Sequence, residues 1–161
     1  MIRNVTQNDA SQLTEIYNYY IKNTVITFEK SEINEQEMAN RISENLSENL
    51  PWIVFEEDSD LLGYAYASKW KSRCSYRFSV EVTVYLHNEI KGKGFGSQLY
   101  KELINQIKEL KYHALIGGIS LPNEASIKLH EKFGFKKVAH FKEVGYKFNK
   151  FIDVGYWELI L

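Results

Sequence analysis

The stretch from Phe78 to Leu110 constrains the fold more than any other part of the chain. Its first part alternates apolar and polar residues, which is the period of a β-strand with two different faces. Three glycines follow at every second position, Gly92, Gly94 and Gly96. The apolar residues after them recur at helical spacing. The stretch therefore predicts a strand, a glycine-rich turn and a helix that begins directly after the turn.

The two periodic patterns predict which side chains face the core. Glu81 interrupts the apolar strand and falls on its polar face. The apolar face of the strand is expected to carry Phe78, Val80, Val82, Val84 and Leu86, opposite Ser79, Glu81, Thr83 and Tyr85. The apolar stripe of the helix is expected to carry Leu99, Leu103, Ile107 and Leu110.

The remaining patterns extend this unit into one domain spanning residues 1–161. Strand patterns occupy 2–5, 52–57, 61–70 and 113–120, and two more lie between 135 and 161. Helical patterns follow a cap at Asn8 or Asp9, cover 35–48, and run from Pro122-Asn123 to a C-terminal glycine at 134. The order β-α-α-β-β-β-α-β-α-β-β predicts an α+β fold with a mixed sheet covered by helices. The chain has no repeat, low-complexity tract or linker that would divide it.

Composition excludes several classes of protein. The formal net charge is −1, from 20 Lys+Arg against 21 Asp+Glu, so nothing favours nucleic acid as a partner. No apolar run approaches the roughly 18 residues of a membrane span, and the first residues do not resemble a signal peptide. Cys74 is the only cysteine, which excludes an intrachain disulfide and favours a reducing compartment, the cytoplasm.

The glycine turn has the features of a phosphate-binding site. A helix N-terminus offers free N–H groups and the positive end of the helix dipole, and glycine lets the backbone approach an anion. Lys91 and Lys93 add positive charge. The turn does not have the spacing of a P-loop, and it lies too late in the chain for a dinucleotide fingerprint. A solvated loop before a helix is the alternative.

The sequence around the turn resembles a known family. "KGKGFG" resembles the R/Q-x-x-G-x-G/A signature of the GNAT acyltransferases, with Lys91 where the signature usually has Arg or Gln. The resemblance extends over nearly the whole chain and is nearest to the phosphinothricin N-acetyltransferase branch. It is carried by "IYNYYIKNTVITF", "GYAYASKWKSRCSYRFSVEVTVYL", "SLPNEASIKLHEKFGF" and "VGYKFNKFIDVGYWEL".

The resemblance implies the GNAT fold, a mixed, mostly antiparallel and splayed sheet flanked by helices, and acetyl-CoA as co-substrate. It implies that the backbone of Val84, Tyr85 and Leu86 pairs with the pantetheine arm. The pyrophosphate is then expected in the turn formed by Gly92, Lys93, Gly94, Phe95, Gly96 and Ser97. Asn123 matches a family position that contacts the cofactor, although an N-cap role explains it equally. Helical spacing places Ser126 and His130 on the same face as Asn123.

Glu81 and His130 are the predicted catalytic residues. Acetylation needs a neutral amine, and a carboxylate can remove the ammonium proton before attack on the thioester. Similar enzymes carry a glutamate at the position of Glu81 as the proposed base; a structural ion pair is the alternative. His130 matches a second residue implicated in the family, and a histidine with an unperturbed pKa of about 6.5 can shuttle protons at neutral pH, although a lone helix histidine is often structural. The histidines and Cys74 have no metal-ligand spacing, so no metal is expected.

The predicted acceptor is a small amine with an anionic or strongly polar side chain. Lys71, Arg73 and Tyr76 suit the oxygens of a carboxylate together with a phosphinate, sulfone or sulfoximine, unless the loop is simply solvated. The resemblance adds Phe28 and Tyr85 as apolar walls. An acidic pocket for an aminoglycoside does not fit these cations.

Two other functions stay open: a GNAT protein N-terminal acetyltransferase and a non-catalytic acetyl-CoA-binding module. The second is opposed by the presence of both Glu81 and His130. The resemblance and the aromatic C-terminal strands predict a homodimer.

Overall fold

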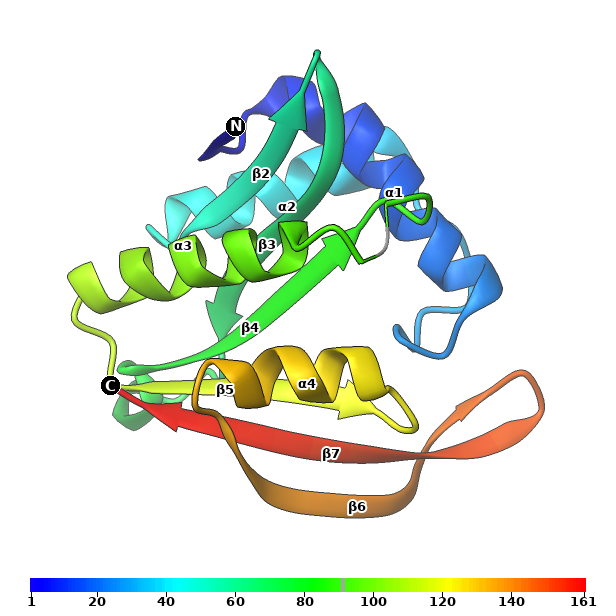
Figure 1. Ribbon diagram of the computed structural model, residues 1–161, viewed down its shortest axis with the longest axis vertical. Coiled ribbons are helices and arrows are strands. Elements are labelled where there is room, and N and C mark those ends of the chain that lie inside the picture. Colours follow the sequence, from blue (N-terminus) through cyan, green and yellow to red (C-terminus); the bar gives the residue numbers. More distant parts are fainter. Residues whose placement is uncertain (91) are drawn as a thin grey trace.

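The computed structural model describes residues 1–90 and 92–161, and Lys91 lies outside the described residues. The elements follow the order expected from the sequence, with two short 3-10 turns added (Figure 1). The strands are β1 (Ile2–Asn4), β2 (Trp52–Glu57), β3 (Asp60–Lys69), β4 (Ser79–Leu86), β5 (Ala114–Ser120), β6 (Lys136–Lys147) and β7 (Lys150–Ile160). The helices are α1 (Ala10–Asn23), α2 (Glu35–Ser47), α3 (Phe95–Glu109) and α4 (Glu124–Lys132), and the 3-10 turns are η1 (Gln7–Asp9) and η2 (Cys74–Tyr76).

The described strands form one sheet in the order β1-β2-β3-β4-β5-β7-β6. Neighbouring strands run antiparallel except β4 and β5, which are parallel. Their pairing joins Ser79–Glu81 to Ala114–Ile116, and the two strands then diverge (Figure 1). This arrangement confirms the mixed, mostly antiparallel and splayed sheet.

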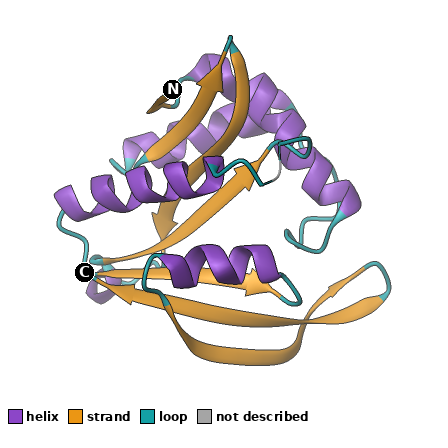
Figure 2. Cartoon of the chain, in the orientation of Figure 1, coloured by secondary structure: helices purple, strands orange, loops and turns teal. Residues whose placement is uncertain are grey.

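Helices cover the two faces of the sheet (Figure 2). One core cluster joins α3 to β2, β3, β4, β5 and the end of β7, and the other packs α1 and α2 against β2, β3 and β4. Leu99, Leu103 and Ile107 of α3 are fully buried, as the helical stripe predicts. β4 is buried on both faces over part of its length, because Val82 belongs to the first cluster and Tyr85 to the second.

Two residues expected in the core are exposed. Leu110 is 49% exposed because α3 ends at Glu109 and Leu110 is its C-cap. Phe78 is 51% exposed and lies one residue before β4, so the alternating pattern continues beyond the strand itself. Among the described residues, no helix combines the length and apolar character needed to cross a membrane.

Candidate active site

The sheet opens into a cavity of about 280 Å³ where β4 and β5 stop pairing. Its walls come from both strands, from one face of α4, from Tyr66 of β3 and from the segment after α1. The cavity brings together these residues singled out from the sequence: Phe28, Glu81, Val84, Tyr85, Asn123, Ser126 and His130. The splay therefore gathers side chains that lie far apart along the chain.

The edge of β4 that faces β5 has no described strand partner beyond Glu81. The other edge stays paired with β3 as far as Leu86. An open edge offers N–H and C=O groups to an extended ligand, and Val84 and Tyr85 line the cavity on this edge. Leu86 differs, because its carbonyl oxygen accepts a hydrogen bond from the Tyr20 hydroxyl at 2.7 Å. This bond occupies one of the two lone pairs of the Leu86 carbonyl oxygen.

The glycine turn adopts a backbone conformation that favours glycine. Gly92 and Gly94 both have φ of 81°, and Gly94 is the N-cap of α3. An added Cβ at either position would meet no atom within 4 Å, so the turn faces open space. The requirement for glycine here is thus set by the positive φ and not by packing. The first N–H groups of a helix have no partner within the helix, so those of α3 are available to an anion bound at the turn.

Packing ties the glycine turn to the end of β4. A Cβ on Gly96 would lie 3.3 Å from the Leu86 side chain, so the start of α3 sits close to the strand. Lys93 is exposed beside the turn. The Ser97 hydroxyl accepts a hydrogen bond from the Lys132 ammonium group at 3.0 Å, which adds a cation from α4. The predicted contribution of Lys91 lies outside the described residues.

Glu81 is a half-buried carboxylate at the point where the strands separate. Burial raises its pKa above the ordinary value of 4.5. No hydrogen bond or ion pair joins it to another described residue, so the structural ion pair has no partner in that part of the chain. An unpaired carboxylate with a raised pKa is a stronger proton acceptor than an ordinary surface glutamate.

His130 is 3% exposed and both its ring nitrogens are engaged. Nδ1 lies 2.7 Å from the Ser126 carbonyl oxygen, which can only accept, so Nδ1 carries the proton. Nε2 then accepts a hydrogen bond from the Tyr100 hydroxyl at 2.7 Å. Burial lowers the pKa of His130. This geometry supports a neutral histidine that joins α3 to α4, and a catalytic role for His130 stays a prediction.

Asn123 is the N-cap of α4, and its predicted contact with the cofactor stays a prediction. Its Oδ1 accepts from the Ser126 backbone N–H at 3.1 Å, which caps α4. Its side chain also lines the cavity, as Ser126 does. The cap uses only the amide oxygen, so the Nδ2 group of Asn123 remains able to donate to a ligand.

The residues predicted to bind the acceptor fall into two places. Phe28 and Tyr85 line the cavity. Lys71 lines a neighbouring hollow with Trp70 and Tyr156, while Arg73 and Tyr76 are exposed on and before η2. The cavity of the isolated chain therefore does not include Lys71, Arg73 or Tyr76.

Tyr156 lines the neighbouring hollow and lies close to Gly118, as Glu81 does. An added Cβ on Gly118 would lie 3.1 Å from the Tyr156 ring and 3.4 Å from Glu81 Oε1. The Trp70 and Tyr156 rings lie 5.6 Å apart in an edge-on arrangement. Lys71 lines the same hollow, with its Nζ 5.2 Å from the centre of the Trp70 ring.

Four polar residues of the cavity were not singled out as site residues from the sequence: Thr27, Tyr66, Thr83 and Ser120. Tyr66 and Thr83 face each other across β3 and β4. Ser120 ends β5, and its Oγ is buried without a hydrogen-bond partner among the described residues. The alternating pattern of β4 places Thr83 on the same face as Glu81, so the sequence could have predicted Thr83 as a site residue. No local pattern indicates Tyr66 or Ser120, because they reach the cavity only through the separation of β4 from β5, which is a tertiary feature.

Comparisons with known proteins agree with this geometry. Residues 2–155 match the family profile described as Acetyltransferase (GNAT) domain. A phosphinothricin N-acetyltransferase from Streptomyces viridochromogenes is 33% identical over 157 residues, which cover 98% of this chain and 85% of the relative. An L-methionine sulfoximine/L-methionine sulfone acetyltransferase from Salmonella typhimurium is 32% identical over 163 residues, with coverage of 99% and 94%.

Solved structures with similar folds point the same way. A phosphinothricin acetyltransferase from Sinorhizobium meliloti in complex with acetyl-CoA has a TM-score of 0.97 and 34% identity, covering 100% of this chain and 88% of the other. A ribosomal-protein-alanine N-acetyltransferase from Brucella melitensis has a TM-score of 0.98 and 32% identity, with coverage of 100% and 99%.

The fold, the splayed site and the matching profile show that the chain belongs to the GNAT acetyltransferases and is an acetyl-CoA-dependent acyltransferase. Within that family it stands with the phosphinothricin and methionine sulfoximine/sulfone N-acetyltransferases. Among the described residues, no group of three or more His, Cys, Asp or Glu side chains is arranged to hold a metal ion.

Proposed function

We propose that this enzyme acetylates the α-amine of a small amino acid with a strongly polar side chain, such as phosphinothricin, methionine sulfone or methionine sulfoximine. The observation that carries the proposal is the half-buried Glu81 carboxylate, which has no ion-pair partner among the described residues and lies in the cavity at the splay. The similarity to relatives named for these substrates supports the choice of acceptor.

The proposed mechanism is direct transfer. Glu81 takes a proton from the acceptor ammonium group, directly or through water, and the neutral amine attacks the carbonyl carbon of the thioester. The bond from carbon to sulfur then breaks, the attacking nitrogen gives up its second proton to leave a neutral amide, and the thiolate of CoA takes up a proton. The edge of β4 and the N-terminus of α3 hold the cofactor, with Asn123 and Ser126 contributing from α4.

The acceptor is proposed to bind between the cavity and the hollow beside Tyr156. Phe28 and Tyr85 provide apolar contact, while Lys71, Arg73 and Tyr76 attract the anionic end of the molecule. Lys71 and Tyr156 line the same hollow, and Tyr156 and Glu81 both lie close to Gly118, which supports this orientation.

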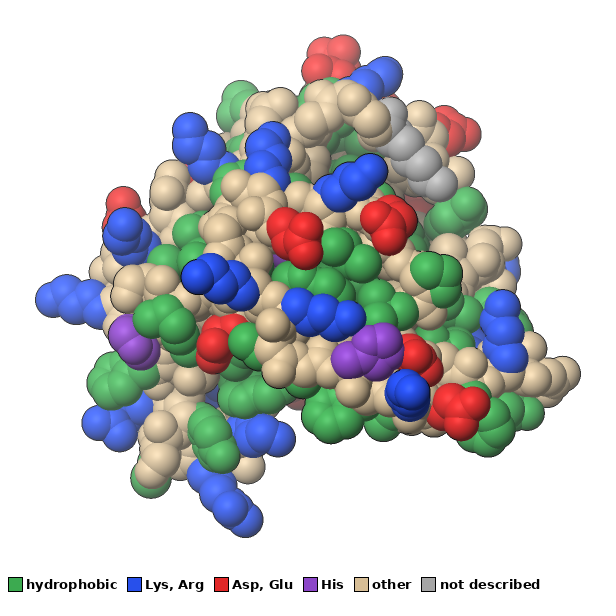
Figure 3. Space-filling model, turned by 60° about the horizontal axis from the view of Figure 1, so that its bottom comes forward, with side chains coloured by type: hydrophobic (Ala, Val, Ile, Leu, Met, Phe, Trp, Pro, Cys, Tyr) green, Lys and Arg blue, Asp and Glu red, His purple; other side chains and the backbone are tan. Residues whose placement is uncertain are grey.

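We also propose a homodimer that packs through β6 and β7. Large apolar side chains on this hairpin are exposed to solvent, and Figure 3 shows apolar side chains among basic ones where this side comes forward. They are Val138, Phe141, Val144, Phe148, Phe151 and Ile160. An apolar surface of this kind is typical of a protein interface. Light scattering on the purified protein tests it, and a monomeric mass at micromolar concentration overturns it.

A cytoplasmic location is proposed because Cys74 is a free and exposed thiol, which persists in a reducing compartment. Acetylation of phosphinothricin there would give resistance to that compound.

The acceptor class is tested with a panel of amines in the presence of acetyl-CoA, following the release of free CoA thiol. The panel contains phosphinothricin, methionine sulfone, methionine sulfoximine, methionine, an aminoglycoside and a short peptide beginning with alanine. We expect the first three to give the highest kcat/KM, by roughly tenfold over methionine, because a charge-assisted contact is lost with the thioether.

Protein N-terminal acetylation is the second candidate, and the similarity to the ribosomal-protein-alanine enzyme favours it. If the peptide has the highest kcat/KM in the panel, this candidate replaces the first. Binding of acetyl-CoA without thiol release from any amine would identify a non-catalytic module.

A further inference from the structure

The segment between α1 and α2 forms a wall of the active site without having regular structure of its own. Residues 24–34 contain no helix or strand, yet Ile26, Thr27 and Phe28 line the cavity. A loop that shapes a binding site must be held by contacts from elsewhere. The loop therefore raises the question of which residues fix its position.

One side of the loop is anchored by α1 and α2. The Thr27 Oγ1 and the Tyr17 hydroxyl lie 2.8 Å apart. Burial and the nearby Glu29 carboxylate raise the pKa of Tyr17 to about 12, so the phenol keeps its proton. Glu29 accepts a hydrogen bond from the Arg41 guanidinium at 2.6 Å. These contacts hold the loop from the side of the N-terminal helices.

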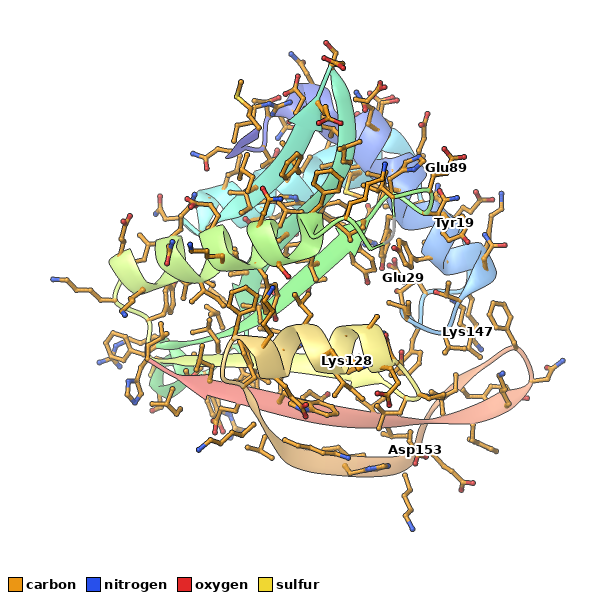
Figure 4. The ribbon with its side chains drawn as sticks, in the orientation of Figure 1. Tyr19, Glu29, Glu89, Lys128, Lys147 and Asp153 are labelled. Atoms are coloured by element: carbon orange, nitrogen blue, oxygen red, sulfur yellow. The ribbon has the colours of Figure 1, made fainter. Side chains whose placement is uncertain are left out.

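The other side of the loop is held by Lys147, at the end of β6. Lys147 is 2% exposed, and its Nζ donates to the Thr27 carbonyl oxygen at 2.8 Å. Burial lowers the pKa of Lys147, and the negative charge of Glu29 opposes that shift. Figure 4 shows Lys147 between the loop that carries Glu29 and the tip of the β6–β7 hairpin. A buried lysine is costly, so this contact is a specific feature and not an incidental surface bond.

Gly145 makes the second contact between the hairpin and the loop. A Cβ at Gly145 would lie 2.3 Å from the tip of the Phe28 ring, which is far closer than real atoms approach. The ring of Phe28 thus rests directly on the β6 backbone. Lys30 adds a third contact, with its Nζ 5.4 Å from the centre of the Tyr146 ring.

A bulge in β6 bends the hairpin toward the loop. The register shifts between Phe141 and Gly145, which places extra residues on β6. Glu143 within the bulge has φ of 55°, and its N–H donates to Asp153 Oδ1 at 2.8 Å. The other carboxylate oxygen of Asp153 lies 2.7 Å from His140 Nε2. Bulges bend a strand and re-aim its side chains, and the tip of the hairpin curves toward the loop in Figure 1.

We propose that Lys147 and Gly145 are positioning residues that hold Thr27 and Phe28 against the cavity, so that the hairpin tip sets which acceptors the enzyme takes. Neither residue lines the cavity, and both act through the loop. The inference rests on the proposed function for the identity of the acceptor, but the contacts themselves do not depend on it.

The test compares Lys147→Met with Lys150→Met. Lys150 pairs with Lys147 in the β6–β7 register but is exposed, so its loss controls for removing one charge from the hairpin tip. We expect Lys147→Met to raise the acceptor KM about tenfold, because a charge-assisted hydrogen bond to the loop is lost. The KM for acetyl-CoA should stay within about twofold, and Lys147→Arg should restore part of the acceptor affinity.

Gly145→Ala tests the same wall by steric means. The added methyl group displaces the Phe28 ring, so acceptor KM should rise in the natural background. In a Phe28→Ala background the substitution should cost little, because the ring it displaces is already gone. Equal effects in both backgrounds overturn the role of Gly145.

Hydrogen exchange supplies a readout that needs no activity. Amides in residues 24–34 should exchange faster in Lys147→Met than in the unchanged protein or in Lys150→Met, with α3 unaffected. Unchanged exchange in this segment, or equal changes in the KM of acceptor and acetyl-CoA, overturns the proposal. If the amine panel selects a peptide instead of an amino acid, the proposed acceptor is wrong while the exchange result still decides whether the hairpin positions the loop.

Discussion

The two sides of the active site are built in different ways. The proposed acetyl-CoA side comes mainly from one continuous stretch, residues 81–97, in which a strand edge leads through a glycine turn into a helix. The proposed acceptor side combines residues 26–28, 71–76 and the hairpin tip at 145–147. The first is local and regular, whereas the second depends on contacts between loops far apart in the chain. Cofactor binding and acceptor choice should therefore respond to different substitutions.

Loss of the carboxylate between the two sides has the largest expected effect. Glu81→Gln should lower kcat by roughly 10²–10⁴ while the affinity for acetyl-CoA hardly changes, because only the proton acceptor is removed. Glu89→Gln, which removes an exposed carboxylate beyond β4, is the matched control. Steady-state kinetics and acetyl-CoA titration measure the two quantities.

The pH profile sharpens the assignment of Glu81. Burial raises its pKa, so activity should fall as pH decreases through a pKa above 4.5, since the base is then protonated. In Glu81→Gln the fall in activity at low pH should begin at a higher pH, near the pKa of the acceptor amine, because only solvent can then remove the proton. A near-normal kcat for Glu81→Gln, with the same dependence of activity on pH, would show that Glu81 is not the general base.

The second largest effect is expected on acetyl-CoA binding, when Gly94 of the glycine turn is replaced. Gly94→Val places a β-branched residue at a φ of 81° and should distort the turn. The strain of roughly 1–2 kcal/mol should raise the KM for acetyl-CoA by roughly 5- to 30-fold. The ratio of kcat/KM among acceptors should stay the same. Gly94→Ala should show a smaller effect in the same direction. An unchanged affinity in a folded Gly94→Val protein counts against the pyrophosphate site.

The acceptor side should respond selectively to charge. Arg73→Ala should raise KM for phosphinothricin by up to about tenfold, the low end of a charge-assisted contact, because the side chain is exposed and screened by solvent. Arg77→Ala in the same exposed loop is the control. Equal losses toward methionine and phosphinothricin would show that Arg73 does not recognise the anion.

The smallest kinetic effect is expected on loss of the hydrogen bond between Tyr100 of α3 and His130 of α4. Tyr100→Phe removes the donor to His130 Nε2 and should cost about 1 kcal/mol in the free energy of unfolding, with kcat within a few-fold. His130→Phe should lower kcat by more than about 10² only if the histidine itself transfers a proton.

Acid unfolding offers an independent test of the neutral His130. Its pKa is lowered in the folded protein, so the unfolded chain binds a proton more readily below pH of about 6.5. Its contribution to the free energy of unfolding should therefore fall as pH drops below that value. His130→Phe should reduce this pH dependence, as measured by urea unfolding at pH 7 and pH 5.5.

Much of the fold could be predicted from local patterns. The alternation of β4, the stripe of α3, the cap at Asn123 and the glycine at 134 all correspond to observed features. The errors at Phe78 and Leu110 lie at element ends, where a pattern continues but the helix or strand does not. Ends depend on caps and on tertiary cover, which periodicity does not report.

The sequence by itself determined the order of elements, the glycine turn and the carboxylate in the central strand, because each depends on neighbours within a few residues. Only the tertiary structure decided that β4 and β5 separate after Glu81, that both nitrogens of His130 are engaged, and that Tyr66 and Ser120 face the cavity. It also decided that Lys147 reaches Thr27, a contact across 120 residues of sequence. Such contacts arise from how the layers pack, and no short-range pattern in the chain specifies them.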